Sequence, residues 1–131
     1  MIAIDTNVVV RILVADSPEQ TDRAKALVRH TPVWVSTTVV LEAAWVLSSR
    51  YGFSPTMVAD ALTSLGGLPG VTFEKAEAIH RAFDAVRAGL DFADAIHLAL
   101  ASDQTAFATF DKELAGRAAA WELGLGDVIL L

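Results

Sequence analysis

Four acidic residues stand within or beside apolar runs, spread over the whole chain: Asp5, Glu42, Asp94 and Asp111. An unpaired carboxylate in apolar surroundings costs several kcal/mol. Two carboxylates about 4 Å apart also repel each other by ~4 kcal/mol at an effective dielectric constant near 20. A hard divalent cation offsets both costs, and magnesium or manganese prefers oxygen ligands of this kind. We therefore predict that the four acids share a metal site.

A site of this composition suits the hydrolysis of a phosphodiester bond. A divalent metal can polarise a phosphoryl oxygen, lower the pKa of a bound water and stabilise the leaving oxygen. Four carboxylates could hold two ions, and two or three of them with water could hold one. No histidine stands as an obvious general base, which agrees with a metal-activated water.

Three of the acids also have a purely structural interpretation. Asp5 and Asp111 could each cap the helix that follows them, because aspartate is a preferred N-cap residue. Asp91 and Asp94 lie three residues apart at a helix start, a spacing that resembles a capping box. Asp91 is the better cap of the two, and Asp94 should then point inward.

Glu42 is the hardest of the acids to explain structurally. Helical spacing places it beside Val39, Ala43 and Val46, which we expect to form an inward-facing stripe. A buried ion pair would need a basic partner, and the nearest, Arg50, is two helical turns away.

The elements predicted from patterning bring the four acids to one edge of a sheet. Short strands are predicted at 2–5, 33–35, 71–73, 107–109 and 127–131, and helices at 5–14, 17–29, 37–51, 54–66, 74–88, 91–102 and 111–120. Strands alternating with helices indicate an α/β domain with a mainly parallel central sheet of four to five short strands flanked by helices. Ligands bind beyond the carboxyl ends of such strands. Two acids follow predicted strands, and the other two lie in the first turns of helices that should begin at the same edge.

Local signals support several of these helix boundaries. Ser17 should cap the second helix, with Gln20 completing a capping box, and Thr37 or Thr38 should cap the third. Within the helix predicted at 74–88, four residues have inward spacing: Ala76, Ile79, Phe83 and Val86.

Composition bounds the class of protein. The chain has 131 residues, 53% of them apolar, with a mean hydropathy of +0.45, which predicts one compact domain over residues 1–131. The absence of cysteine excludes disulfides and thiolate metal sites and fits a cytoplasmic location. No signal peptide is evident, and no run reaches ~18 uninterrupted apolar residues, so no membrane span is predicted. The net charge of −6 argues against a phosphate-binding surface, but bound metal would reverse the local sign at the acids.

The ordered motifs resemble a known family, the PIN domain. They are Ile4-Asp5-Thr6-Asn7, Val40 to Leu47 around Glu42, Asp91 to Ala99 around Asp94, and Thr109-Phe110-Asp111-Lys112. The set looks more closely like the VapC toxins of bacterial toxin–antitoxin pairs, and it covers nearly the whole chain. The resemblance implies a parallel sheet flanked by helices, and a magnesium- or manganese-dependent endoribonuclease that cleaves RNA. It also implies a homodimer and inhibition by a cognate VapB-like antitoxin.

The family pattern carries over residue by residue. Asp5, Glu42 and Asp94 match its three central acids, and Asp111 matches a fourth acid that varies more. Thr6 and Thr109 match hydroxyl positions that often hold a carboxylate or water.

Several other side chains have open roles. His97 stands one turn after Asp94 and could bind metal, although a structural role is the commoner one. Four basic residues could contact phosphate or be solvated surface charges: Arg11, Arg50, Lys112 and Arg117. Trp45, Val46 and the helix over 55–65 could form a dimer or antitoxin surface, or belong to the core.

Two rival functions remain open from the sequence. A small phosphatase or phosphotransfer domain also places acids after its first strand, but the haloacid dehalogenase type would have Asp-x-Asp where this chain has Asp5-Thr6-Asn7. A non-catalytic binding module could retain the acids for metal or for capping. Magnesium titration followed by an RNA cleavage assay separates that module from a nuclease.

Overall fold

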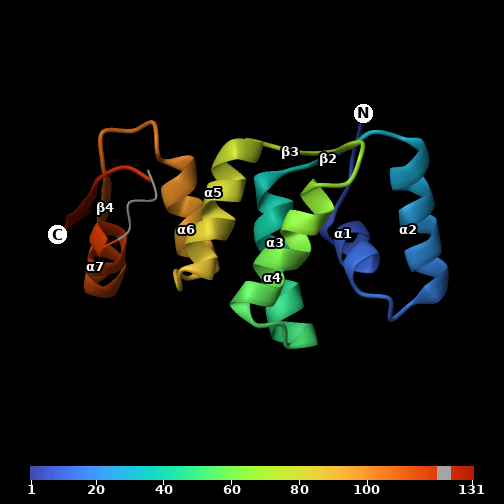
Figure 1. Ribbon diagram of the computed structural model, residues 1–131, viewed down its shortest axis with the longest axis horizontal. Coiled ribbons are helices and arrows are strands. Elements are labelled where there is room, and N and C mark those ends of the chain that lie inside the picture. The colour runs from blue at the N-terminus through green and yellow to red at the C-terminus, as the bar shows by residue number, and fades with distance from the viewer. Residues whose placement is uncertain (121–124) are drawn as a thin grey trace. The chain divides into compact units, whose positions relative to one another are not determined.

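The computed structural model describes residues 1–120 and 125–131, and the described chain forms two compact units, Met1–Ala76 and Glu77–Leu131. The N-terminal unit contains β1 (Ile2–Ala3), α1 (Thr6–Leu13), α2 (Pro18–His30), β2 (Val33–Val35), α3 (Thr37–Tyr51), α4 (Pro55–Gly66) and β3 (Val71–Phe73). The C-terminal unit contains α5 (Ala76–Arg87, starting at the boundary), α6 (Phe92–Leu100), β4 (Phe107–Thr109), α7 (Lys112–Ala120) and β5 (Val128–Leu130). Figure 1 labels most of these elements.

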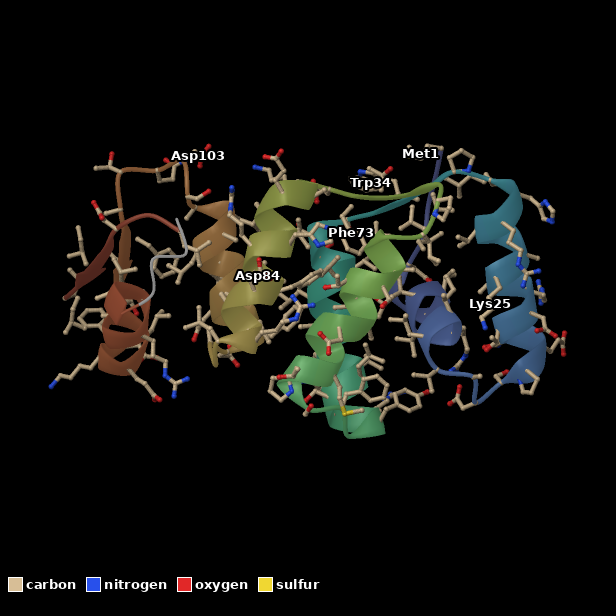
Figure 2. All side chains as sticks on the ribbon, in the orientation of Figure 1. Met1, Lys25, Trp34, Phe73, Asp84 and Asp103 are labelled. Carbon is tan, nitrogen blue, oxygen red and sulfur yellow. The ribbon has the colours of Figure 1, made fainter. Side chains whose placement is uncertain are left out.

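The N-terminal unit is built on a three-stranded parallel sheet in the order β1-β2-β3. The central strand β2 contributes Val33 and Val35, which are fully buried, and Phe73 of β3, labelled in Figure 2, is also buried. Helix α1 packs against α2 and α3, and α3 packs against α4, which lies beside it in Figure 1. The apolar side chains buried between these helices fix the positions of α1 and α3.

The C-terminal unit carries a second parallel pair of strands, β4 and β5, with Phe107 paired to Val128. Helix α7 packs against both strands. Phe83 of α5 is fully buried, and its ring centroid lies 5.8 Å from that of Phe92, which joins α5 to α6.

The α/β class and the parallel pairing are confirmed, with a difference in the sheet. The five predicted strands all occur among the described residues, but they form a three-stranded and a two-stranded sheet instead of one central sheet. None of the described helices is long and apolar enough to cross a membrane.

Two predicted helix caps are wrong, although α2 and α3 begin close to where they were predicted. Ser17 occupies the N-cap position of α2 but makes no side-chain cap hydrogen bond, and the side chain of Gln20 accepts a hydrogen bond from Arg11 instead of completing a capping box. Helix α3 is capped by Ser36, whose hydroxyl accepts from the N–H of Val39, and not by either threonine.

The predicted start of α5 is wrong, because this helix begins two residues later than predicted. Lys75 has a left-handed backbone (φ +49°) that breaks the helix, and the Glu74 side chain is engaged elsewhere. Ala76 is exposed, whereas the other three residues predicted to face inward, Ile79, Phe83 and Val86, are buried.

Candidate active site

Asp5 stands at the junction of β1 and α1. The preceding Ile4 is buried and donates its N–H to the carbonyl of Trp34, which ties this junction to β2. Asp5 is exposed, and its Oδ1 accepts the N–H of Val8 at 3.0 Å, so the capping interpretation is confirmed. The cap uses one carboxylate oxygen, and Oδ2 makes no hydrogen bond with the described part of the chain. Asp5 can therefore cap α1 and still offer an oxygen to a ligand.

Glu42 lies on the exposed face of α3, and the prediction that it points inward is wrong. The buried face of this helix is formed by Val40, Ala43, Ala44 and Leu47. The sequence is apolar on nearly every side here, so its period could not select the face. Two small alanines allow close packing on one side, and the opposite side, including Glu42, is left to solvent.

Asp5 and Glu42 line the same cleft of the N-terminal unit, which has a volume of about 480 Å³. The other side chains that line it are Thr6, Asn7, Val10, Arg11, Val39, Trp45, Val46, Arg50 and Tyr51. The cleft thus combines two carboxylates, an amide and two hydroxyls with cationic and aromatic groups. The carboxylate, amide and hydroxyl side chains of the cleft all offer oxygen atoms. Oxygen is the ligand that a hard divalent cation prefers.

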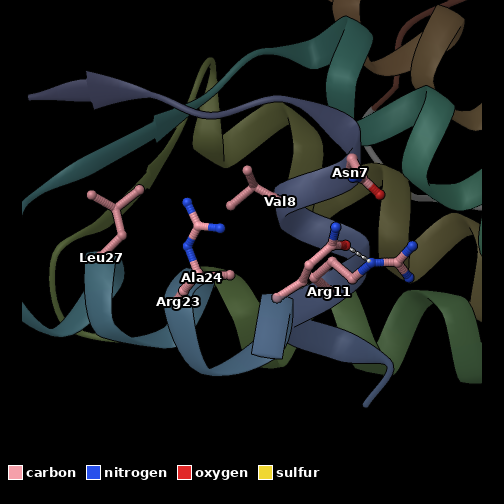
Figure 3. A pocket seen from close by; sticks show the side chains of 7 residues that line it. Asn7, Val8, Arg11, Arg23, Ala24 and Leu27 are labelled. Carbon is pink, nitrogen blue, oxygen red and sulfur yellow. Dashed lines mark hydrogen bonds between the residues drawn. The ribbon is translucent and has the colours of Figure 1, made fainter. Parts of the chain in front are cut away.

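One wall of this cleft is fixed by a polar network around Arg11. Its Nη1 contacts Asp16 at 2.8 Å and the hydroxyl of Tyr51 at 3.3 Å, and that hydroxyl donates to Asp16 at 2.7 Å. The Tyr51 hydrogen bond and then the charge of Arg11 lower the pKa of Asp16. Nε of Arg11 donates to Gln20 at 2.6 Å, the dashed line in Figure 3. Arg11 is therefore held in place and is not a freely solvated charge.

A second anchor fixes the first turn of α3, and the sequence reasoning missed it. Glu74, directly after β3, accepts hydrogen bonds from the backbone N–H of Thr37 at 2.9 Å and from its hydroxyl at 3.0 Å. These two bonds lower the pKa of Glu74. Because Glu42 is carried by α3, Glu74 helps to position it. The sequence feature that could have identified Glu74 is an acid directly after a predicted strand, the same feature that identified Asp5.

In the C-terminal unit, Asp91 caps α6 through the N–H of Asp94 at 3.2 Å, as predicted. Asp94 is half-buried, and its pKa is raised, first by burial and then by the negative charges of Asp91 and Asp111. The nearby His97, which is exposed, opposes this shift. The Asp94 and Asp111 carboxylates are thus close enough to repel each other.

Asp111 is exposed and caps α7. Its Oδ1 accepts the N–H groups of Glu113 at 2.9 Å and Leu114 at 3.1 Å, and its own N–H donates to the Thr109 hydroxyl at 3.0 Å. The structural interpretation is confirmed for this residue also. Arg117, a candidate for phosphate contact, pairs with Glu113 and donates to the carbonyl of Gly89.

The four predicted acids therefore fall into two pairs, one in each unit. Within either unit, the described residues bring no three His, Asp or Glu side chains together as a ready-made metal site. The oxygen-rich donor set of the cleft nevertheless fits magnesium or manganese, which bind through a few carboxylates and retain waters. A single site shared by all four acids stays a prediction.

Comparison with known families decides the class of protein. The chain matches the PIN domain over residues 2–120. It belongs to the PIN domain family. The match spans both compact units and includes all four predicted acids. PIN domains are typically metal-dependent nucleases that bind divalent metals such as magnesium. No curated protein sequence matches the chain.

Proposed function

We propose that this PIN domain is a magnesium- or manganese-dependent endoribonuclease and the toxin of a VapBC-type toxin–antitoxin pair. The cleft that contains both Asp5 and Glu42 carries the proposal, because it places two candidate ligands from separate elements around one space. Asp94 and Asp111 of the C-terminal unit are the other two proposed metal ligands, Asp111 less directly. The four motifs that resemble the VapC toxins support the toxin assignment.

The cleft residues have distinct roles in this proposal. Oxygen atoms of Asp5 and Glu42 would hold the cation. Asp5 can do this while it caps α1, because the cap uses only Oδ1. Arg11, held by Asp16 and Tyr51, presents a fixed positive charge to an RNA phosphate. A bound divalent cation would polarise the phosphoryl oxygen and activate the attacking water.

RNA cleavage by the purified chain tests this proposal. We expect cleavage with Mg²⁺ or Mn²⁺ and none with chelator. Asp5→Asn, Glu42→Gln and Asp94→Asn should each reduce it by at least ~100-fold, within the range that loss of a metal's contribution to catalysis allows. Asp22→Asn, which neutralises an exposed acid of α2 outside the cleft, is the matched control and should cleave like the wild type. A folded wild-type chain, free of antitoxin, that leaves RNA intact with both metals would exclude the nuclease.

The proposed partners are a VapB-like antitoxin, which would inhibit cleavage, and a second copy of the chain in a cytoplasmic homodimer. Light scattering of the purified chain tests whether it forms a homodimer. Adding the protein encoded by an adjacent reading frame to the cleavage assay tests for the antitoxin. Loss of RNA cleavage on adding that protein, at a molar ratio near one to one, is the expected result.

A further inference from the structure

Trp45 is placed unusually for a tryptophan. It is 65% exposed, whereas tryptophan is highly buried on average. It is one helical turn after Glu42 on α3, a spacing at which side chains are neighbours on one face, about 5–6 Å apart at Cβ. Both residues line the cleft. The buried face of α3 is formed by other residues, so most of the large Trp45 ring is left to solvent.

The surroundings of Trp45 combine cationic, acidic and apolar groups. The same cleft contains Arg50 and Arg11, the latter ion-paired with Asp16, as well as the proposed metal ligands Asp5 and Glu42, and Val46 adds apolar surface. Cationic groups with an exposed aromatic ring are the combination by which proteins hold single strands, because the cations track the backbone and the ring stacks on a base. The C-terminal unit repeats the association of acid and aromatic: Phe110, which is 81% exposed, directly precedes Asp111.

We propose that Trp45 stacks on an unpaired nucleobase next to the scissile phosphate of the RNA. This inference rests on the proposed nuclease function. In a duplex both faces of each base are covered by neighbouring bases, so the ring has a partner only where the bases are splayed. Stacking of this kind tolerates any base, since every base has a π-face. Trp45 thus discriminates between unpaired and paired bases more strongly than between one base and another.

Three substitutions at this position separate stacking from simple apolar contact. Trp45→Ala should weaken binding of a single-stranded oligonucleotide by about 5- to 150-fold, the range that corresponds to the loss of one base–aromatic stack. Trp45→Phe keeps an aromatic face and should retain most of the affinity, whereas Trp45→Leu keeps only apolar bulk and should behave like Trp45→Ala. Met57→Ala removes another exposed apolar side chain, on α4 outside the cleft, and should change nothing.

Binding is measured by fluorescence anisotropy of an end-labelled single-stranded RNA, with Ca²⁺ in place of Mg²⁺, and of the fully paired duplex of the same sequence. The duplex should bind more weakly than the single strand and should not respond to Trp45→Ala. Steady-state cleavage in Mg²⁺ should show the loss in KM, with kcat nearly unchanged. Thermal melts of the variants should match the wild type, because the ring is exposed.

The possible results separate this inference from the proposed function. Wild-type cleavage with an unchanged KM for Trp45→Ala overturns the stacking role and leaves the nuclease intact. Binding that depends on Trp45 without any cleavage removes the nuclease and retains the stacking role. If Trp45→Ala instead dissociates a dimer and leaves single-strand affinity unchanged, the ring is an interface residue and the inference is wrong.

Discussion

Asp5 has two separable roles, and two substitutions can divide them. Its Oδ1 caps α1 through the N–H of Val8 at 3.0 Å, and its negative charge is proposed to hold the metal. Asp5→Asn keeps a carbonyl oxygen at the cap, and asparagine ranks with aspartate as an N-cap residue. Asp5→Ala removes the acceptor, which costs about 1 kcal/mol, with a range of roughly 0.5–2. Both changes remove the charge.

The two variants should therefore diverge in stability and agree in activity. We expect the free energy of unfolding of Asp5→Asn to lie within ~0.5 kcal/mol of the wild-type value, since only the weak interaction of the Asp5 charge with the helix dipole is lost. Asp5→Ala should lose about 1 kcal/mol, a fall in Tm of about 2 to 6 °C for a chain of this size. RNA cleavage with Mg²⁺ should be lost in both.

Urea unfolding followed by circular dichroism, beside a cleavage assay on the same samples, measures both quantities. Cleavage that survives in Asp5→Asn and falls in Asp5→Ala would mean that the cap alone matters to activity, and would refute the ligand role. Equal stability of the two variants would refute the capping argument instead.

Three further predictions concern the side-chain contacts of Glu74, Tyr51 and Asp111. Glu74→Ala should destabilise the chain by at most ~1 kcal/mol at neutral pH, because Thr37 loses its acceptor on a partly screened carboxylate. The pKa of Glu74 is lowered in the folded chain, so its contribution is present above the unfolded pKa and is lost as pH falls through the folded one. Urea titrations of wild type and Glu74→Ala should therefore converge as the pH falls below the ordinary pKa of a glutamate and through the lower folded one, and a difference that persists at the acid limit contradicts the assignment. Tyr51→Phe removes the hydroxyl that holds Asp16 and Arg11, and should raise KM for RNA more than it lowers kcat; an unchanged KM would mean that Arg11 does not meet the substrate. Asp111→Ala should lower the stability by about 1 kcal/mol through loss of the α7 cap while Asp111→Asn does not, and thermal melts that rank them equally would refute this.

Most of the fold was accessible from local patterns. Strands such as Val33–Val35 and Val71–Phe73 are short apolar runs between turn residues, and their bounds were predicted correctly. The cap at Asp91 was predictable because a side chain that reaches three residues along the chain is a local feature. The capping box predicted at Ser17 is absent, and its second member, Gln20, makes a side-chain hydrogen bond with the more distant Arg11.

Two features of the site needed the tertiary structure. The anchor between Glu74 and Thr37 joins residues 37 apart in sequence, so no local pattern contains it. The orientation of α3 failed for another reason. A helix that is apolar on nearly every side gives no periodic signal, and the tight fit of Ala43 and Ala44 against the core then decides which face is covered.

The structure changes the physical reason for assigning a function to these acids. Burial first singled them out, yet Asp5, Glu42 and Asp111 are exposed, and only Asp94 is half-buried. Capping gives Asp5 and Asp111 a structural task that is sufficient by itself to keep them. Glu42 has no such task, because it caps no helix and makes no hydrogen bond or ion pair with the described residues. The exposed carboxylate of Glu42, in a cleft beside a capping aspartate and an exposed tryptophan, supports the proposed ligand role. Glu42, which was wrongly predicted to be buried, is therefore the acid whose position argues most strongly for function.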